Sequence, residues 1–252
     1  MTVTPRKSLG QHFLVDENIL RVIEGLADLQ ADDVVLEIGP GLGVLTRFLA
    51  ARVAHVHAVE LDRRLAAHLA GIERTTVHWG DALRLDVTSL APPPVKLVAN
   101  LPYNVATPVV AESLAAGQLR SWCVMVQREV ADRFFAPPGT KPYGSVSVLV
   151  QLAATRTGFH AVSREVFRPR PNVESALVAF TRTGPGASVD VKRVVEASFA
   201  HRRKTLANAL ALSGLATRER AVEALRAIGR ESAVRAERLE PGEFVALTEA
   251  LS

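Results

Sequence analysis

The sequence predicts an α/β fold with a parallel sheet covered on both faces, followed by a small helical domain. Short β-rich runs alternate with helical patterns up to about residue 180, an order typical of parallel strands joined by crossover helices. The segment 183–188 is rich in turn-forming residues and indicates a linker. Only helical patterns follow it. We therefore expect a main domain over residues 1–183 and a helical C-terminal domain over residues 189–252.

The elements of the main domain are expected where β-branched or helix-forming residues are concentrated. Strands are predicted at residues 34–38, 55–60, 76–79, 95–99 and 122–127. Helices are predicted between strands, at residues 42–51, 63–70 and 108–116. The runs 146–153 and 175–181 are also β-rich, with no clear helix between them. We expect these two runs to close the sheet as an antiparallel pair.

The C-terminal domain is expected to contain helices only. Their predicted ranges are 189–198, 204–212, 218–228 and 242–251. Thr217 stands where an N-cap belongs, but Arg220 rather than an acidic residue is third after it, so the capping box is only partial.

The composition limits the class of protein and its partners. A net charge of +4 and a pI of about 9.6 favour polyanionic partners. The single cysteine, Cys123, permits no disulfide framework within the chain and stands in an apolar run, as a buried side chain would. No apolar run reaches the roughly 18 residues of a membrane helix, and the N-terminus has no signal-peptide core. We expect a cytoplasmic protein without a membrane segment. Nothing indicates an oligomer, and a monomer is assumed.

A glycine-rich loop predicts a ligand site after the first strand. Gly39, Gly41 and Gly43 stand between the acidic strand residue Glu37 and a predicted helix. Glycines let the backbone approach a ligand, and the helix start offers free N–H groups. A dinucleotide fingerprint requires glycine or alanine where Val44 stands, which argues against NAD.

Two further acidic residues extend this pattern. Glu60 ends the next strand about 20 residues on, where a carboxylate can accept hydrogen bonds from ribose hydroxyls. Asp81 follows the third strand, where a carboxylate can accept a hydrogen bond from a cofactor's adenine amine. Together with the glycine loop, this arrangement resembles the class I (Rossmann-like) methyltransferases, and the resemblance implies S-adenosylmethionine as cofactor. No metal is expected, because the possible pair His55 and His57 has no third ligand nearby in the sequence.

The tetrapeptide Asn100-Leu101-Pro102-Tyr103 is the most specific motif and ends the fourth strand. It resembles the amino-methyltransferase motif, in the form seen in ribosomal RNA adenine dimethylases. The side-chain oxygen of Asn100 and the carbonyl of Leu101 can accept hydrogen bonds from the two N–H groups of an adenine amine. These bonds direct the lone pair of the amine toward a methyl donor. Pro102 stiffens the turn and Tyr103 can stack on the base. Such a tetrapeptide also suits an ordinary turn, but its place after a parallel strand favours catalysis.

Longer segments resemble the small-subunit (16S) ribosomal RNA adenine N6,N6-dimethyltransferases, the KsgA/RsmA family. They span nearly the whole chain, at residues 7–14, 127–131, 142–148, 166–176 and 199–206. The resemblance implies a seven-stranded sheet whose last strand is antiparallel. It implies two methyl transfers to each of two adjacent adenines in the 3′-terminal hairpin of the RNA, with the assembling small subunit as partner.

The same resemblance suggests roles for individual residues. His12 and Leu14 would lie beside the cofactor, together with Gly39, Gly41, Glu60, Asp81 and Asn100. Phe167 would pack on the target adenine from the face opposite Tyr103. Asparagine often stands in the family where this chain has His12, and a neutral imidazole can still donate to the cofactor's carboxylate.

Basic residues predict RNA contacts at two places. Arg6 and Lys7 lie near the N-terminus, and Arg202, Arg203 and Lys204 precede or open a predicted helix. Such side chains bind phosphates and release counterions. A cluster of charges on a solvated surface is the alternative interpretation.

Three other functions are weighed. A large-subunit (23S) ribosomal RNA adenine methyltransferase conferring antibiotic resistance would share the fold, cofactor and tetrapeptide. Leu101 and the segment 143–148 favour the small-subunit enzyme instead. A non-catalytic assembly factor on the same scaffold is disfavoured by the intact Glu60, Asp81 and Asn100. An NAD oxidoreductase is disfavoured by Val44.

Overall fold

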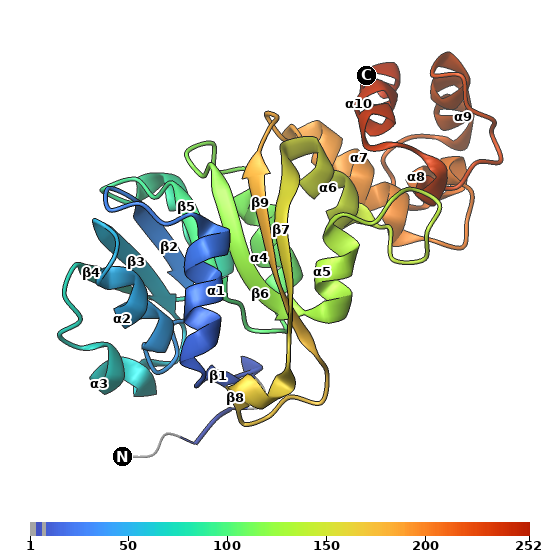
Figure 1. Cartoon of the computed structure of the whole chain (residues 1–252). Helices are drawn as coiled ribbons and strands as arrows, with labels where there is room; N and C mark the ends of the chain where they lie inside the picture. Colours follow the sequence, from blue (N-terminus) through green and yellow to red (C-terminus); the bar gives the residue numbers. More distant parts are fainter. Residues whose placement is uncertain (1–3, 7–8) are drawn as a thin grey trace. The chain divides into compact units, whose positions relative to one another are not determined.

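The computed structural model describes residues 4–6 and 9–252 (Figure 1). The chain divides into two compact units, residues 1–131 with 155–182 and residues 132–154 with 183–252. The second unit contains the expected helical range 189–252. It also contains residues 132–154 from the middle of the chain, which the division at residues 183–189 did not anticipate.

The first unit is built on a seven-stranded sheet with the order β4-β3-β2-β5-β6-β9-β7. In chain order its strands are β2 (Val34–Ile38), β3 (His55–Glu60), β4 (Thr75–Trp79), β5 (Lys96–Asn100), β6 (Ser121–Gln127), β7 (Ala154–Val162) and β9 (Ser175–Arg182). Strands β2 to β6 pair in parallel. Strand β9 is antiparallel to β6, with Ser175 opposite Gln127. These pairings confirm the expected seven-stranded sheet with its last strand antiparallel.

Alternating side chains give the sheet two apolar faces. On β6, Cys123 and Met125 join the core cluster that includes α1 (Glu17–Ala27). Trp122 points to the other face, where its Nε1 donates a hydrogen bond to Ser113 Oγ of α4 (Ala106–Ser113) over 2.9 Å. Helices therefore cover both faces, as the order of elements predicts (Figure 1). Cys123 is buried, as expected, and burial raises the pKa of its thiol to about 12.

One predicted strand is wrong. The run 146–153 belongs to a helix, α6 (Ser145–Ala153), in the second unit. Its side chains are buried on nearly all sides, so no polar stripe marks a helical period. Gly144 N–H donates to Ser147 Oγ over 3.0 Å at the start of the helix. The additional strand beside β9 is β7, which was not predicted.

Other elements differ from the prediction in smaller ways. The expected helix 63–70 is a 3-10 turn (Arg63–Leu65) followed by α3 (Ala66–Leu69). The helix after the glycine loop is α2 (Val44–Ala50). Helix α1 was missed, although Asp16 caps it by accepting from Asn18 N–H over 2.7 Å. Also missed were α5 (Arg128–Phe134) and the short strands β1 (Phe13–Leu14) and β8 (Phe167–Arg168).

The second unit contains the four predicted C-terminal helices. They are α7 (Val189–Ala200), α8 (Leu206–Leu212), α9 (Arg218–Ala227) and α10 (Pro241–Leu251). Thr217 caps α9 as predicted, accepting from Arg220 N–H over 3.2 Å. The fully buried Tyr143 donates its hydroxyl to Leu239 O over 2.9 Å, which joins the segment before α6 to the C-terminal part of this unit.

Across residues 4–6 and 9–252, no helix combines the length and apolar character that crossing a bilayer requires.

Candidate active site

The carboxyl ends of four parallel strands meet at one edge of the sheet. Gly39, Glu60, Asp81 and Asn100, which end or follow β2, β3, β4 and β5, all line one pocket. The pocket holds about 1020 Å³ of empty space, part of it continuous with solvent. It lies where the strand order reverses between β2 and β5, the position where open α/β sheets bind ligands. The sequence-predicted residues Leu14, Gly41, Leu101, Pro102, Tyr103 and His12 also line it.

The glycine loop keeps the backbone close to its neighbours. Gly39 has φ +74° and Gly41 has φ +58°, a region that side chains disfavour. A Cβ atom at Gly39 would lie 3.0 Å from two ring carbons of Pro102, and one at Gly41 would lie 3.0 Å from the ring of Phe13. Glycine at these two positions therefore lets the loop pack directly against Pro102 and Phe13.

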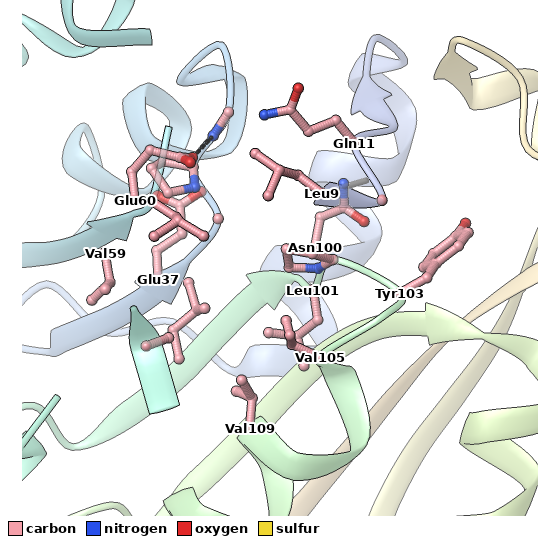
Figure 2. Close-up of a pocket in the computed structure, with 18 of the residues that line it drawn as sticks. Leu9, Gln11, Glu37, Val59, Glu60, Asn100, Leu101, Tyr103, Val105 and Val109 are labelled. Atoms are coloured by element: carbon pink, nitrogen blue, oxygen red, sulfur yellow. Dashed lines mark hydrogen bonds between the residues drawn. The ribbon is translucent and has the colours of Figure 1, made fainter. Parts of the chain in front are cut away.

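Glu60 is tied to the same loop by its carboxylate. Oε2 accepts from Gly41 N–H over 3.2 Å and Oε1 accepts from Asp62 N–H over 2.8 Å. Burial raises the pKa of Glu60, while these two N–H donors oppose the rise. In Figure 2, Glu60 and Glu37 lie on one side of the pocket, and Asn100 and Tyr103 lie on the other.

Glu37 is a pocket residue that the sequence analysis did not assign to the site. Its side chain is 1% exposed, it lines the pocket, and Oε2 is buried with no hydrogen-bond partner among the described residues. Burial of the carboxyl raises the pKa of Glu37 to about 8; the nearby Thr46 hydroxyl opposes this rise and the charge of Glu60 adds to it. An acidic residue at the end of an otherwise apolar strand was the signal that could have identified it.

The pocket surface is acidic and partly apolar. Glu37, Glu60 and Asp81 line it, and neither lysine nor arginine occurs among its described lining residues. Leu61 and Leu83 also line it yet remain 56% and 39% exposed. The carboxylates of Glu60 and Asp81, next to exposed apolar side chains, suit a cationic ligand that carries a flat ring. The same surface disfavours the pyrophosphate of NAD.

Asp81 stands at the rim. It is exposed, and its Oδ1 accepts from Leu83 N–H over 3.0 Å. This bond uses Oδ1, and Oδ2 is a second acceptor of the same carboxylate. The turn that Asp81 caps carries Leu83, so the carboxylate and the apolar side chain are placed together.

The Asn100 amide is oriented by the N-terminal segment. Its Nδ2 donates to the backbone carbonyl of His12 over 3.1 Å, which leaves Oδ1 as the amide's acceptor group. Leu101 N–H donates to Met125 O of β6 over 3.0 Å, so the start of the tetrapeptide is held against the sheet. The Asn100 bond thus places an acceptor oxygen at the end of β5.

The Tyr103 ring is held from two sides. Its hydroxyl hydrogen-bonds to Ser175 Oγ over 2.5 Å. The His12 ring stacks on it with centroids 5.2 Å apart and an interplanar angle of 28°. His12 Nδ1 lies 2.8 Å from the carbonyl oxygen of Pro169, so Nδ1 carries the hydrogen. A neutral His12 then offers Nε2 only as an acceptor, which does not match the expected donation to a carboxylate.

Phe167 does not lie where the family resemblance places it. Its side chain is 0% exposed, belongs to the core cluster with α1, and is not among the residues that line the pocket. Strand β8 pairs with β1, and Leu14 is the register partner of Phe167. Because side chains alternate along a strand, Phe167 points into the core and Arg168 points to solvent.

The predicted RNA-contacting residues are exposed where they are described. Arg6, Arg202, Arg203 and Lys204 are exposed, and Lys7 lies outside the described residues. Arg202, Arg203 and Lys204 stand in the turn before α8 rather than inside the helix. Arg202 donates from its guanidinium to Lys141 O and Tyr143 O, over 3.1 and 3.0 Å. Arg202 therefore also holds the structure of its own unit.

The histidines of β3 form hydrogen bonds to protein groups. His57 Nε2 lies 2.8 Å from Pro92 O, and His57 Nδ1 lies 3.0 Å from His78 Nε2. His55 Nε2 lies 3.0 Å from Thr76 Oγ1. The described part of the chain contains no group of three or more metal-ligating side chains arranged to hold a metal ion.

Comparisons with known proteins identify the family. The family profile described as ribosomal RNA adenine dimethylase matches residues 3–251. A ribosomal RNA small subunit methyltransferase A from Rubrobacter xylanophilus is 46% identical over 258 residues, covering 100% of this chain and 97% of the relative. Another protein of that name, from Kineococcus radiotolerans, is 45% identical and covers 97% of this chain and 85% of the relative.

Solved structures show the same fold. A dimethyladenosine transferase from Plasmodium falciparum superposes with a TM-score of 0.73 at 22% identity, covering 94% of this chain and 96% of that one. The 23S rRNA methyltransferase ErmE superposes with a TM-score of 0.63 at 27% identity, covering 95% and 99%. With a profile match over almost its entire length, the chain belongs to the ribosomal RNA adenine dimethylase family, and its sheet is that of a class I methyltransferase.

Proposed function

We propose that the chain transfers methyl groups from S-adenosylmethionine to N6 of two adjacent adenines in the 3′-terminal hairpin of small-subunit (16S) ribosomal RNA. The observation that carries the proposal is the orientation of Asn100 at the pocket. The bond from Asn100 Nδ2 to His12 O leaves Oδ1 as an acceptor next to the glycine loop.

The acceptor groups at the end of β5 account for the chemistry. The lone pair of an adenine amine is delocalised into the ring, so the amine is a weak nucleophile. Asn100 Oδ1 and the Leu101 carbonyl are proposed to accept hydrogen bonds from its two N–H groups and so localise the lone pair on nitrogen. These interactions strengthen as the nitrogen becomes tetrahedral, and interactions of that kind raise turnover rather than affinity. Pro102 keeps the turn rigid, and Tyr103 stacks on the base.

The residues of the pocket fit the proposed cofactor. When bound, S-adenosylmethionine supplies an electrophilic methyl group on a positively charged sulfur. Glu60 would accept from the ribose hydroxyls and Asp81 from the adenine amine, with Leu61 and Leu83 against the ring. Gly39 and Gly41 line the pocket with backbone only. The unpartnered, buried Glu37 oxygen would face the cationic portion of the ligand.

RNA is proposed to reach this pocket with the target adenine out of its stack, which is less costly in a hairpin loop than in a duplex. Arg6, Lys7, Arg203 and Lys204 would contact phosphates. We propose the assembling small subunit in the cytoplasm as partner and place of action. The 23S alternative is less favoured, because ErmE is 27% identical to this chain whereas curated relatives named for the small subunit reach 46%.

The substrate is tested by methylating purified RNA and assembly-stage subunits with isotope-labelled S-adenosylmethionine. Mass spectrometry should find dimethyladenosine in the 3′-terminal hairpin of 16S RNA and none in 23S RNA. Label confined to 23S RNA would contradict the proposal. In cells, 16S RNA from a deletion strain should lack both dimethyladenosines.

The catalytic assignment is tested with Asn100→Ala. We expect the single-turnover methylation rate to fall by about 10²–10³, as when one oriented transition-state interaction is removed. The melting temperature and the affinities for cofactor and RNA should stay close to those of the wild type. A variant that is less stable but has normal turnover per folded molecule would show that Asn100 only shapes a turn.

A further inference from the structure

We propose that Ser175 is a positioning residue for the reaction, acting through the hydroxyl of Tyr103 so that the aromatic ring presents one fixed face to the target adenine. This inference rests on the proposed function, because it concerns how the substrate base is received. Nothing in the sequence motif around Tyr103 indicates which residue holds it, since Ser175 lies 72 positions further along the chain.

Ser175 is well placed to anchor the ring. It is the first residue of β9, is 1% exposed, and is fixed opposite Gln127 by the antiparallel register with β6. Strand β9 lies between β6 and β7, so it is not at an edge of the sheet. The Ser175 hydroxyl hydrogen-bonds to the Tyr103 hydroxyl over 2.5 Å. The far end of the tyrosine ring is therefore bonded to the sheet, although its backbone belongs to a loop.

His12 restrains the same ring from one face. The two rings stack with a centroid distance of 5.2 Å, and His12 is held by the hydrogen bond from its Nδ1 to Pro169 O at 2.8 Å. His12 thus occupies space on one face of the ring. An adenine entering the pocket would therefore meet the opposite face of Tyr103. Between them, Ser175 sets the position of the hydroxyl end and His12 sets which face is free.

Positioning of this kind is expected to matter for turnover. A tyrosine on a loop can rotate about two side-chain bonds, and each rotation moves the stacking surface away from the amine acceptors at the end of β5. Reacting groups lose much of their rate advantage when they are displaced by about 1 Å. The Ser175 hydroxyl touches neither of the proposed amine acceptors, so its effect must pass through Tyr103.

A double-mutant cycle with Tyr103→Phe tests this route. Ser175→Ala is expected to lower kcat for 16S RNA by about tenfold, the order expected when one hydrogen bond is removed, with cofactor affinity and RNA KM within about twofold of wild type. In the Tyr103→Phe background, where the hydroxyl partner is already absent, Ser175→Ala should have no further effect. Ser175→Thr, which keeps the hydroxyl, should restore most of the turnover.

Tyrosine NMR gives a readout that is independent of activity. The chain contains two tyrosines, so protein labelled with ¹³C in the tyrosine rings yields two sets of signals. Ser175→Ala should shift the Tyr103 signals and accelerate its ring flips. Tyr143, fully buried in the second unit and bonded to Leu239 O, should remain unchanged.

Ser113→Ala is the matched control, because Ser113 is also a buried serine whose hydroxyl forms a side-chain hydrogen bond, to Trp122. It should lower the melting temperature without changing the Tyr103 signals.

If Ser175→Ala does not fold, Tyr103→Phe tests the proposal alone, because wild-type turnover in that variant overturns it. Equal reductions in kcat from Ser175→Ala with and without the Tyr103 hydroxyl also overturn it. If the wild type methylates no 16S RNA, the proposed function fails, whereas the NMR comparison still tests the anchor.

Discussion

A Cβ atom added to Gly39 would lie 3.0 Å from both Cδ and Cγ of Pro102. The glycine loop after β2 and the tetrapeptide after β5 are therefore in direct contact through these two residues. The cofactor loop and the proposed catalytic turn are packed as one surface, and a change in either should affect both.

Gly39→Ala should impair binding and turnover together. The new methyl group would meet Pro102, and φ +74° is strained for alanine by about 1–2 kcal/mol. We expect a lower melting temperature, weaker cofactor binding by calorimetry and reduced kcat. Gly71→Ala is the control, because Gly71 has φ +72° but its Cβ would meet nothing within 4 Å. If both variants behave alike, backbone strain rather than the clash with Pro102 is the cause.

Glu60→Ala should weaken cofactor binding by about 1–3 kcal/mol, the cost of leaving ribose hydroxyls without a charged acceptor. The change also removes the acceptor for Gly41 N–H and Asp62 N–H, so the loop itself should become less ordered. Isothermal titration with S-adenosylmethionine measures the first effect and the melting temperature of the cofactor-free protein measures the second. An unchanged affinity would remove Glu60 from the site.

Glu37 should make the stability of the cofactor-free protein depend on pH. Burial raises its pKa from 4.5 to about 8, so the folded state favours the protonated carboxyl. That contribution is complete below pH 4.5 and is lost as the pH rises through 8. Glu37→Gln keeps a neutral side chain at every pH. Its melting temperature should therefore exceed that of the wild type by an amount that grows as the pH rises from 4.5 to about 8 and levels off above it. A constant difference across this range would contradict a protonated Glu37.

Neutralising Arg203 and Lys204 together should lower RNA affinity and flatten its salt dependence, by about 0.7–0.9 in log–log slope for each phosphate that is no longer bound. Cofactor affinity should not change. Arg202 is tested separately, because its bonds to Lys141 O and Tyr143 O predict a lower melting temperature as well. If the double variant keeps the wild-type salt slope, the cluster is only a solvated surface.

The incorrect and missing elements have identifiable causes. Residues 146–153 form a helix buried on nearly all sides, and such a helix shows the same continuous apolar run as a buried strand. Helix α1 was missed although Asp16, a residue type that favours the N-cap position, stands at its start. Strands β1 and β8 contain two residues each and exist only through their mutual pairing. No pattern among neighbouring residues predicts these two strands.

By itself, the sequence determined where the sheet's first five strands lie along the chain, the glycine loop, the acids at the ends of β3 and β4, and the tetrapeptide that begins at the end of β5. These features are local, since the period of side chains and the backbone freedom of glycine act within a few residues. Only the tertiary structure decided that Phe167 points into the core, that Glu37 has an unpartnered oxygen, and that His12 and Ser175 hold the Tyr103 ring. Each depends on packing between segments far apart in the chain, as Tyr103 and Ser175 are 72 positions apart. Strand pairing and burial bring such residues together, and neither can be read from the residues next to them.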